Sequence, residues 1–252
     1  MAMTPVVASG APEAPAPGPI NHFGRLVGVF FSPKATFESI AARPSWLLPV
    51  LLMTVLGTFT AFVMNQKVDW RDVASKRIEE SPRAANMSAE QKEQQLAVSA
   101  KISPYAAYFF GTLAPVIAVV LVASVMLLAF NVIGGANAKF VQAVGIVAHA
   151  TIVGLIGTLF LILILYLKPP GTIDLDNPVA TNIGSFLPES TPKALMSLGK
   201  SVDVLSIWSI FLISIGFTAV NPKKLSGKAL GIVLSVWGVY VVCKMGLAWI
   251  FS

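Results

Sequence analysis

The chain has 252 residues, of which 55% are hydrophobic and only 12% are charged. Soluble domains carry roughly 25% charged residues, so a soluble protein of this composition would lack the polar surface that covers a core. Composition therefore indicates a membrane protein and argues against an ordinary cytosolic enzyme. The formal net charge is +6, and the bases lie between apolar runs, which favours lipid contact over nucleic-acid binding.

Residues 1–21 are rich in Pro and Ala and predict a disordered tail without the pattern of a signal peptide. Residues 22–45 predict short amphipathic helices that lie in the membrane interface. Ser32-Pro33 is typical of a helix start and divides this segment in two. The apolar stripe ahead of it recurs at helical spacing and consists of Phe23, Leu26, Val27, Phe30 and Phe31.

Residues 46–252 predict a bundle of five transmembrane helices, so the expected fold class is an all-α membrane protein. Five apolar runs are long enough to cross a bilayer, which takes about 20 residues. They lie at about 46–64, 105–132, 140–167, 202–220 and 229–251.

Between the first two runs lies a polar stretch, about 65–103. Residues 69–80 and 88–100 both have helical patterns, and Ser88-Ala89-Glu90-Gln91 fits a capping box. We expect a helical hairpin outside the membrane here.

Charge alone leaves the orientation open. With the N-terminus inside, the inner side holds seven basic residues and the outer side holds ten, which leans towards an outer N-terminus. However, three of the inner bases are concentrated in the short loop 221–228, whereas the outer ones are diluted in long loops, where the rule weakens.

Four polar residues fall inside or at the ends of the predicted spans. His149 lies near mid-membrane, where it is a candidate proton relay or, as we favour, a neutral histidine bonded to a neighbouring helix. Lys244 has three interpretations: a side chain extended to the interface, an ion pair with Asp203, or a transport role. Asn131 is expected to bond across helices.

Small and basic residues gather around the start of the last span. Gly227, Gly231 and Ser235 repeat every four residues and predict a helix-packing seam, within the chain or between copies, with internal packing favoured. Ala150 and Gly154 repeat likewise in the third span. The basic loop holds candidate contacts for anionic lipid headgroups or a plain orientation signal, namely Lys223, Lys224 and Lys228.

Signals of catalysis and of metal binding are poor. The single cysteine excludes an intramolecular disulfide, and the two histidines are too far apart to form a recognisable metal motif. Gly227-Lys228 lacks the leading glycine of a phosphate loop, and neither Gly-x-Ser-x-Gly nor His-Glu-x-x-His occurs. We expect no catalytic residue, no metal and no cofactor, and therefore a protein that is not an enzyme.

Three segments resemble the bacterial branch of the Yip (Ypt-interacting protein) domain family: FFSPKATFESIAARPSWLLPVLL, ESPRAANMSAEQKEQQ and NPKKLSGKALGIVLSVWGVYVV. The most specific part is Ser32-Pro33-x-x-Thr36-Phe37-x-x-Ile40, ahead of Pro44-x-Trp46. The resemblance implies five spans and a cytoplasmic N-terminus, which decides our orientation, in the inner membrane of a bacterium. Eukaryotic relatives engage Rab-type GTPases, but their Asp-Leu-Tyr-Gly-Pro motif is absent here, which puts a GTPase partner in doubt.

The resemblance implies a fold and a location but no established reaction. We therefore expect a membrane-organising scaffold or partner-binding protein that contacts lipids, copies of itself or other membrane proteins. The alternative is a small transporter or channel that uses His149 and Lys244. The odd number of spans shows no convincing internal repeat, which weakens that alternative.

Overall fold

The computed structural model describes residues 21–79, 81, 84, 86–169, 171–188 and 190–250. Within these residues no strand forms, and the one extended pairing is an isolated bridge between Asn182 and Asp203. The tail expected at residues 1–21 lies outside the described residues except for Asn21. The helices are α1 (His22–Phe31), α2 (Pro33–Ala42), α3 (Leu47–Lys67), α4 (Trp70–Glu79), α5 (Ala89–Val132), α6 (Phe140–Thr151), α7 (Gly154–Leu167), η2 (Ile183–Phe186), α8 (Lys193–Ser201), α9 (Val204–Val220), α10 (Pro222–Leu225) and α11 (Ala229–Ile250).

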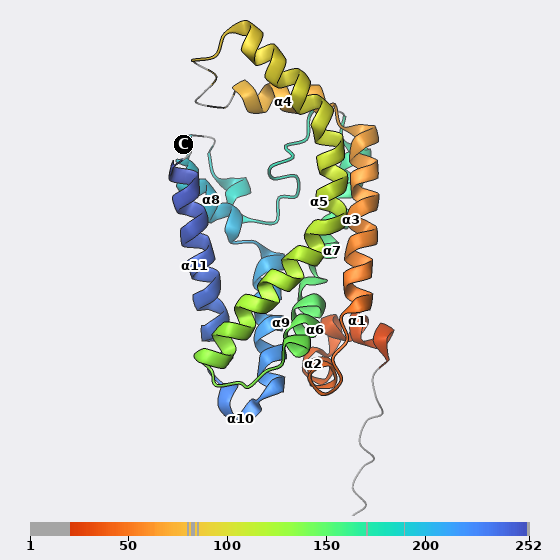
Figure 1. Ribbon diagram of the computed structural model, residues 1–252, viewed down its shortest axis with the longest axis vertical. Helices are drawn as coiled ribbons and strands as arrows, with labels where there is room; N and C mark the ends of the chain where they lie inside the picture. The colour runs from red at the N-terminus through yellow and green to blue at the C-terminus, as the bar shows by residue number, and fades with distance from the viewer. Residues whose placement is uncertain are drawn as a thin grey trace, which may run out of the picture.

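The protein is an all-helical, multi-pass membrane protein by the length and composition of its helices. Four helical segments are apolar and long enough to cross a bilayer, namely α3, α5, the pair α6–α7, and α11. The fifth expected span is α9, which has 17 residues and begins at Val204 because the Asp203 side chain caps its first turn. The long helices run between two ends of the bundle, with α1, α2 and α10 at one end and α4, α8 and the C-terminus at the other (Figure 1).

The expected extramembrane hairpin is only partly correct. The capping box at Ser88 is confirmed, since Gln91 N donates to Ser88 Oγ and Ser88 N donates to the Gln91 side chain. However, the helix that starts there does not end before the second span. It continues through Pro104 and Pro115 as the 44-residue α5. A proline removes one helix hydrogen bond, but in lipid a chain that left the helix would expose many more unpaired backbone groups.

The third span is broken where one continuous helix was expected. Helix α6 ends at Thr151, and α7 begins at Gly154. Between them the backbone changes to 3₁₀-type bonds, with Leu155 N donating to Ile152 O at 2.9 Å. The Thr151 hydroxyl bonds to the carbonyl of Val147 at 2.8 Å, so a side chain competes with the backbone at the break.

Several glycines lie where helices approach one another closely, among them Gly57, Gly111 and Gly216. A Cβ placed on Gly57 of α3 would overlap the carbonyl oxygen of Gly111 in α5, and the reverse also holds. On α9, a Cβ at Gly216 would overlap the Ile146 side chain of α6. Backbones can approach this closely only where no side chain intervenes. The buried hydrophobic cluster includes the contact between α6 and α9, and in it the Phe130 ring of α5 stacks on the Phe217 ring of α9 at a centroid distance of 4.1 Å.

Candidate functional site

The two ends of the bundle differ in charge. One end, called the basic end, is formed by residues 21–46, 133–139 and 221–228. The opposite end is formed by residues 65–103 and 168–203. The basic end carries seven lysines and arginines against one acidic residue, Glu38, whereas the described residues of the opposite end include nine basic and eight acidic ones. The excess positive charge of the described residues is therefore concentrated at the basic end, because the charges of the opposite end nearly balance.

Arg25 fixes α1 onto the chain that leads into the first span. The residue is only 4% exposed, and its guanidinium donates to Arg43 O at 2.8 Å and to Ser45 Oγ at 2.7 Å. Its other terminal nitrogen donates to Ser39 O at 3.2 Å and to Ser39 Oγ at 3.0 Å. The fork of the guanidinium thus bridges the last turn of α2 and the link to α3, a geometry that a lysine cannot reproduce.

Within the described residues, Arg25 is held by neutral oxygens and not by a carboxylate. Burial lowers the pKa of Arg25, and the positive charge of Arg43 lowers it further. Arginine stays protonated even so, which leaves a buried cation. Its Nε makes no hydrogen bond within the part of the chain that the structure describes. Sequence reasoning missed this residue, although a charged side chain on the same helical face as Leu26 and Val29 was a usable signal.

The outer face of α1 is apolar. Phe23, Val27 and Phe31 are 70%, 43% and 82% exposed and recur every four residues. The inner face of the same helix buries Leu26 and Val29 against the bundle. A helix with one face on the protein and large apolar side chains on the other is typical of an interfacial helix at the surface of a membrane.

The basic loop is held in a defined shape. The Asn221 side chain accepts a hydrogen bond from Lys224 N and donates to Ala136 O at 3.3 Å, which ties α10 to the loop between α5 and α6. Leu225 is fully buried beneath the loop. The predicted lipid contacts Lys223, Lys224 and Lys228 are therefore all exposed on a fixed support.

His149 is buried inside α6 with 1% of its surface exposed. Its Nδ1 lies 2.8 Å from the carbonyl oxygen of Gly145, one turn earlier in the same helix. Because a carbonyl oxygen only accepts, Nδ1 carries the proton in this contact. The expected bond to a neighbouring helix is replaced by a bond within α6.

Lys244 and Asp203 lie near one another in the fold but have different partners. The Lys244 ammonium donates to Ser201 Oγ at 3.1 Å. Asp203 accepts from Ser206 N at 2.9 Å and from the Thr181 hydroxyl, and so it serves as the N-cap of α9. Among the described residues, the considered ion pair between Lys244 and Asp203 does not form.

Asn131 closes a loop instead of bonding across helices. Its side chain donates to Ala138 O at 3.1 Å and accepts from Ala138 N at 2.8 Å. Both bonds join the end of α5 to the segment that leads into α6. The sequence could not reveal this partner. Ala138 lies seven residues after Asn131 and is reached across a loop, so no helical spacing links the two residues.

The predicted seam on α11 is not used inside the chain. A Cβ added at Gly227 or Gly231 would meet nothing within 4 Å, and Ser235 is exposed. Gly154 also faces open space, whereas Ala150 is fully buried. The favoured interpretation, internal packing, therefore does not hold for this seam, and Gly231 and Ser235 face outward. Glycines that do lie at close contacts between helices occur on α1, α3, α5 and α9, and no repeat in the sequence marks them.

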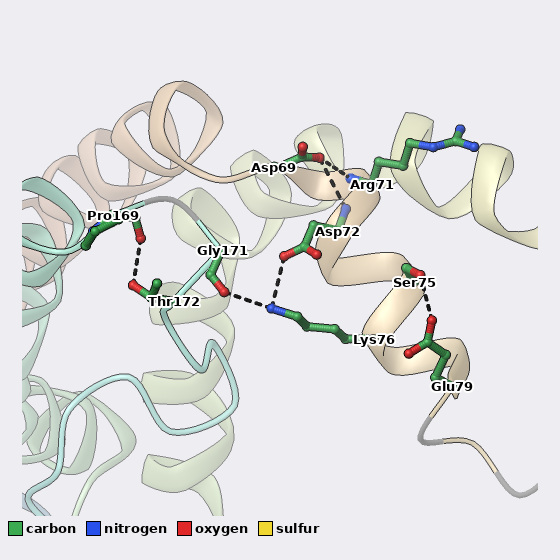
Figure 2. Close-up of polar contacts among 9 residues, drawn as sticks. All are labelled: Asp69, Arg71, Asp72, Ser75, Lys76, Glu79, Pro169, Gly171 and Thr172. Atoms are coloured by element: carbon green, nitrogen blue, oxygen red, sulfur yellow. Dashed lines mark hydrogen bonds and ion pairs between the residues drawn. The ribbon is translucent and has the colours of Figure 1, made fainter.

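At the opposite end, hydrogen bonds and an ion pair join α4 to the loop that follows α7 (Figure 2). Lys76 Nζ donates to Gly171 O at 2.8 Å and pairs with Asp72 at 3.0 Å. Arg77 pairs with Asp176 of the same loop at 2.9 Å. These contacts line an open, polar pocket of about 430 Å³. A second pocket of about 840 Å³ lies between α4 and the start of α5.

Neither pocket is lined by any of the four intramembrane polar residues singled out from the sequence. Within the described residues, no group of three His, Cys, Asp or Glu side chains is placed to hold a metal ion. The four residues singled out from the sequence are thus not brought together in either pocket.

Comparison with protein families finds a match over most of the chain. The model of the Yip1 domain matches residues 27–248, from α1 almost to the end of α11. The chain belongs to the Yip1 domain family. No curated protein matches it, and no solved structure matches it either. The Yip1 domain here includes α2, both glycine crossings and the basic loop, so these features belong to the domain itself and not to the tail.

Proposed function

We propose that this Yip1 domain protein is a non-enzymatic scaffold of a bacterial inner membrane, with five spans and a cytoplasmic N-terminus. It acts by presenting fixed surfaces to lipids and to other transmembrane helices, in its own copies or in other proteins. The observation that carries the proposal is that the polar side chains of the spans hold the chain together instead of lining a common pocket.

The polar contacts support this role one by one. His149 bonds to Gly145 inside α6, and Asn131 closes the loop between α5 and α6. Lys244 bonds to Ser201, and Asp203 caps α9. A transport pathway needs polar groups that face shared space, whereas these groups already have partners within the chain.

Helix α9 is proposed as the fifth span. Its 17 residues give a length of about 25 Å, at the short end of the range that crosses a bilayer. It connects α8 at the opposite end to α10 at the basic end, so the helices before and after it lie at different ends of the bundle (Figure 1). A cytoplasmic N-terminus is supported by the basic end, because basic segments close to the spans favour the cytoplasmic side.

The proposed surface for a partner helix is the outward face of α11. Only 17% of the most apolar 18-residue stretch of this helix is buried, which is the lowest share among the four candidate spans. Gly231, Ser235 and Gly246 lie on the outward side, and a Cβ on either glycine would meet nothing. Small residues let a second helix approach closely in lipid, where packing and not hydrophobicity drives association.

Cysteine cross-linking in native membranes tests this surface. The chain has one cysteine, so Ser235→Cys in a Cys243→Ser background carries a single thiol on the proposed face. Ser124→Cys in the same background is a matched control, because both serines are exposed and both bond to the carbonyl four residues earlier. The proposal predicts a discrete oxidative cross-link for the first variant and none for the second.

Gly231→Leu added to the Ser235→Cys variant should abolish the cross-link, because the leucine would fill the space that a partner helix needs. An equal yield from the two cysteine positions would contradict the proposal, since it would show random collision. So would a protein that stays monomeric and gives no cross-link from either position.

A further inference from the structure

The basic end carries charge that the rest of the protein does not neutralise. Three ion pairs form within the described residues, and all three lie at the opposite end. The basic end is described throughout, and none of its bases joins an ion pair. Six of them are exposed and one, Arg25, is buried. The exposed six are Lys34, Arg43, Lys139, Lys223, Lys224 and Lys228.

These bases come from three separate segments that the fold brings to one end. Lys34 and Arg43 lie at the start of α2 and just beyond its end, and Lys139 precedes α6. Lys223 and Lys224 lie within α10, and Lys228 follows it. Asn221 links α10 to the loop before α6, so two of the segments are fixed to one another. A surface that is assembled from three segments and contains one acidic residue has a strongly positive potential.

Apolar side chains lie at the same end. Phe23 and Phe31 of α1 are 70% and 82% exposed, and Arg25 holds this helix against the bundle. Trp46, 41% exposed, marks the start of the first span, as aromatic residues do at a membrane surface. Exposed aromatic residues beside unpaired bases match a phospholipid leaflet, which offers hydrocarbon and negative phosphate at the same depth.

We propose that the basic end is a binding surface for anionic phospholipid headgroups, formed jointly by α2, α10 and the loop between α5 and α6. An acidic soluble protein would match the charge but would leave the adjoining phenylalanines exposed to water. The inference rests on the membrane-embedded bundle of the proposed function but not on the outward face of α11. Loss of lipid preference and loss of the α11 cross-link are therefore separate outcomes.

The test uses the full chain in nanodiscs of phosphatidylcholine mixed with phosphatidylglycerol, and native mass spectrometry of the lipids that the protein retains. The test variant carries Lys223→Gln, Lys224→Gln and Lys228→Gln. The matched control carries Lys92→Gln, Lys101→Gln and Lys168→Gln, which removes the same charge from exposed positions at the opposite end.

The wild-type protein should retain phosphatidylglycerol in preference to phosphatidylcholine. Each lysine removed from the basic end should lower this preference by about fivefold, because a base near an anionic surface contributes about that factor. The control should keep the wild-type preference. A variant with Lys34→Gln and Arg43→Gln addresses the same surface from α2, and so the test stands even if the α10 variant does not fold.

Two results would overturn the proposal. One is a wild-type protein without a preference for phosphatidylglycerol, and the other is a control that loses as much of the preference as the α10 variant. Retention of an acidic peptide such as polyglutamate, in place of phosphatidylglycerol, would assign the surface to a protein partner and would overturn the proposal as well.

Discussion

Replacing Gly57 by alanine should weaken the crossing between α3 and α5. The added Cβ would overlap the carbonyl oxygen of Gly111, which is backbone and cannot rotate away, so the two helices must separate. Overpacking of this kind costs about 1–3 kcal/mol. Separation also strains the neighbouring bond between the Thr58 and Thr112 hydroxyls, 2.9 Å apart, and such bonds between membrane helices average about 0.6 kcal/mol.

One effect opposes these losses. Alanine favours a helix over glycine by up to about 1 kcal/mol. The expected net result for Gly57→Ala is therefore a loss of about 1–2 kcal/mol in the free energy of unfolding.

The same substitution at Gly231 is the matched control. A Cβ there meets nothing within 4 Å, so only the helix propensity changes, and the free energy of unfolding of the detergent-solubilised monomer should stay equal or rise by up to about 1 kcal/mol. Titration with sodium dodecyl sulfate in mixed micelles, followed by circular dichroism, measures both variants. A Gly57→Ala protein as stable as the wild type, or a Gly231→Ala protein that loses more, would refute the packing described here.

Three further substitutions follow from the contacts. Arg25→Lys should lower the free energy of unfolding by about 1–3 kcal/mol, because an ammonium cannot serve both sides of the fork; an unchanged value in the same titration would contradict the role of the guanidinium. Gly216→Ala should cost about 1–3 kcal/mol where its Cβ overlaps Ile146 and approaches Phe37, seen as a lower Tm, and an equal Tm would be the contrary result. Arg77→Ala should cost less than about 1 kcal/mol because the pair is exposed, and a larger loss would show that this ion pair is more than a surface contact.

The local features of the fold were predictable from sequence. Long apolar runs define the spans because each one satisfies its own backbone in lipid, whatever its neighbours do. The capping box at Ser88 was found for the same reason, since both of its bonds lie within four residues. The break after Thr151 was not found, because no proline marks it, the small residues beside it indicated helix packing, and the bond of the threonine hydroxyl is visible only in the folded chain.

Contacts between helices were much harder to predict. Gly57 and Gly111 are single glycines on different helices, and nothing in either helix alone indicates that they meet. The repeat at Gly231 looked more regular, yet it faces outward. A spacing of four residues shows which residues share a face, but it does not show which neighbour that face meets.

The partners of the polar residues were equally hard to predict from spacing. Lys244 was correctly placed near the start of α9, but its partner is Ser201 instead of Asp203, because Asp203 is already engaged in capping that helix. Arg25 was missed because its acceptors, two carbonyls and two hydroxyls, belong to a turn that only the folded chain brings into reach.

The most direct test of the scaffold proposal is an experimental structure of the full chain in nanodiscs that contain phosphatidylglycerol. The account predicts a helix packed on the outward face of α11, headgroup density at the basic end, and a dry His149 bonded to Gly145. A continuous water-filled cavity from either end of the bundle to His149, with lipid alone on α11, would contradict it and would identify the protein as a conducting pathway.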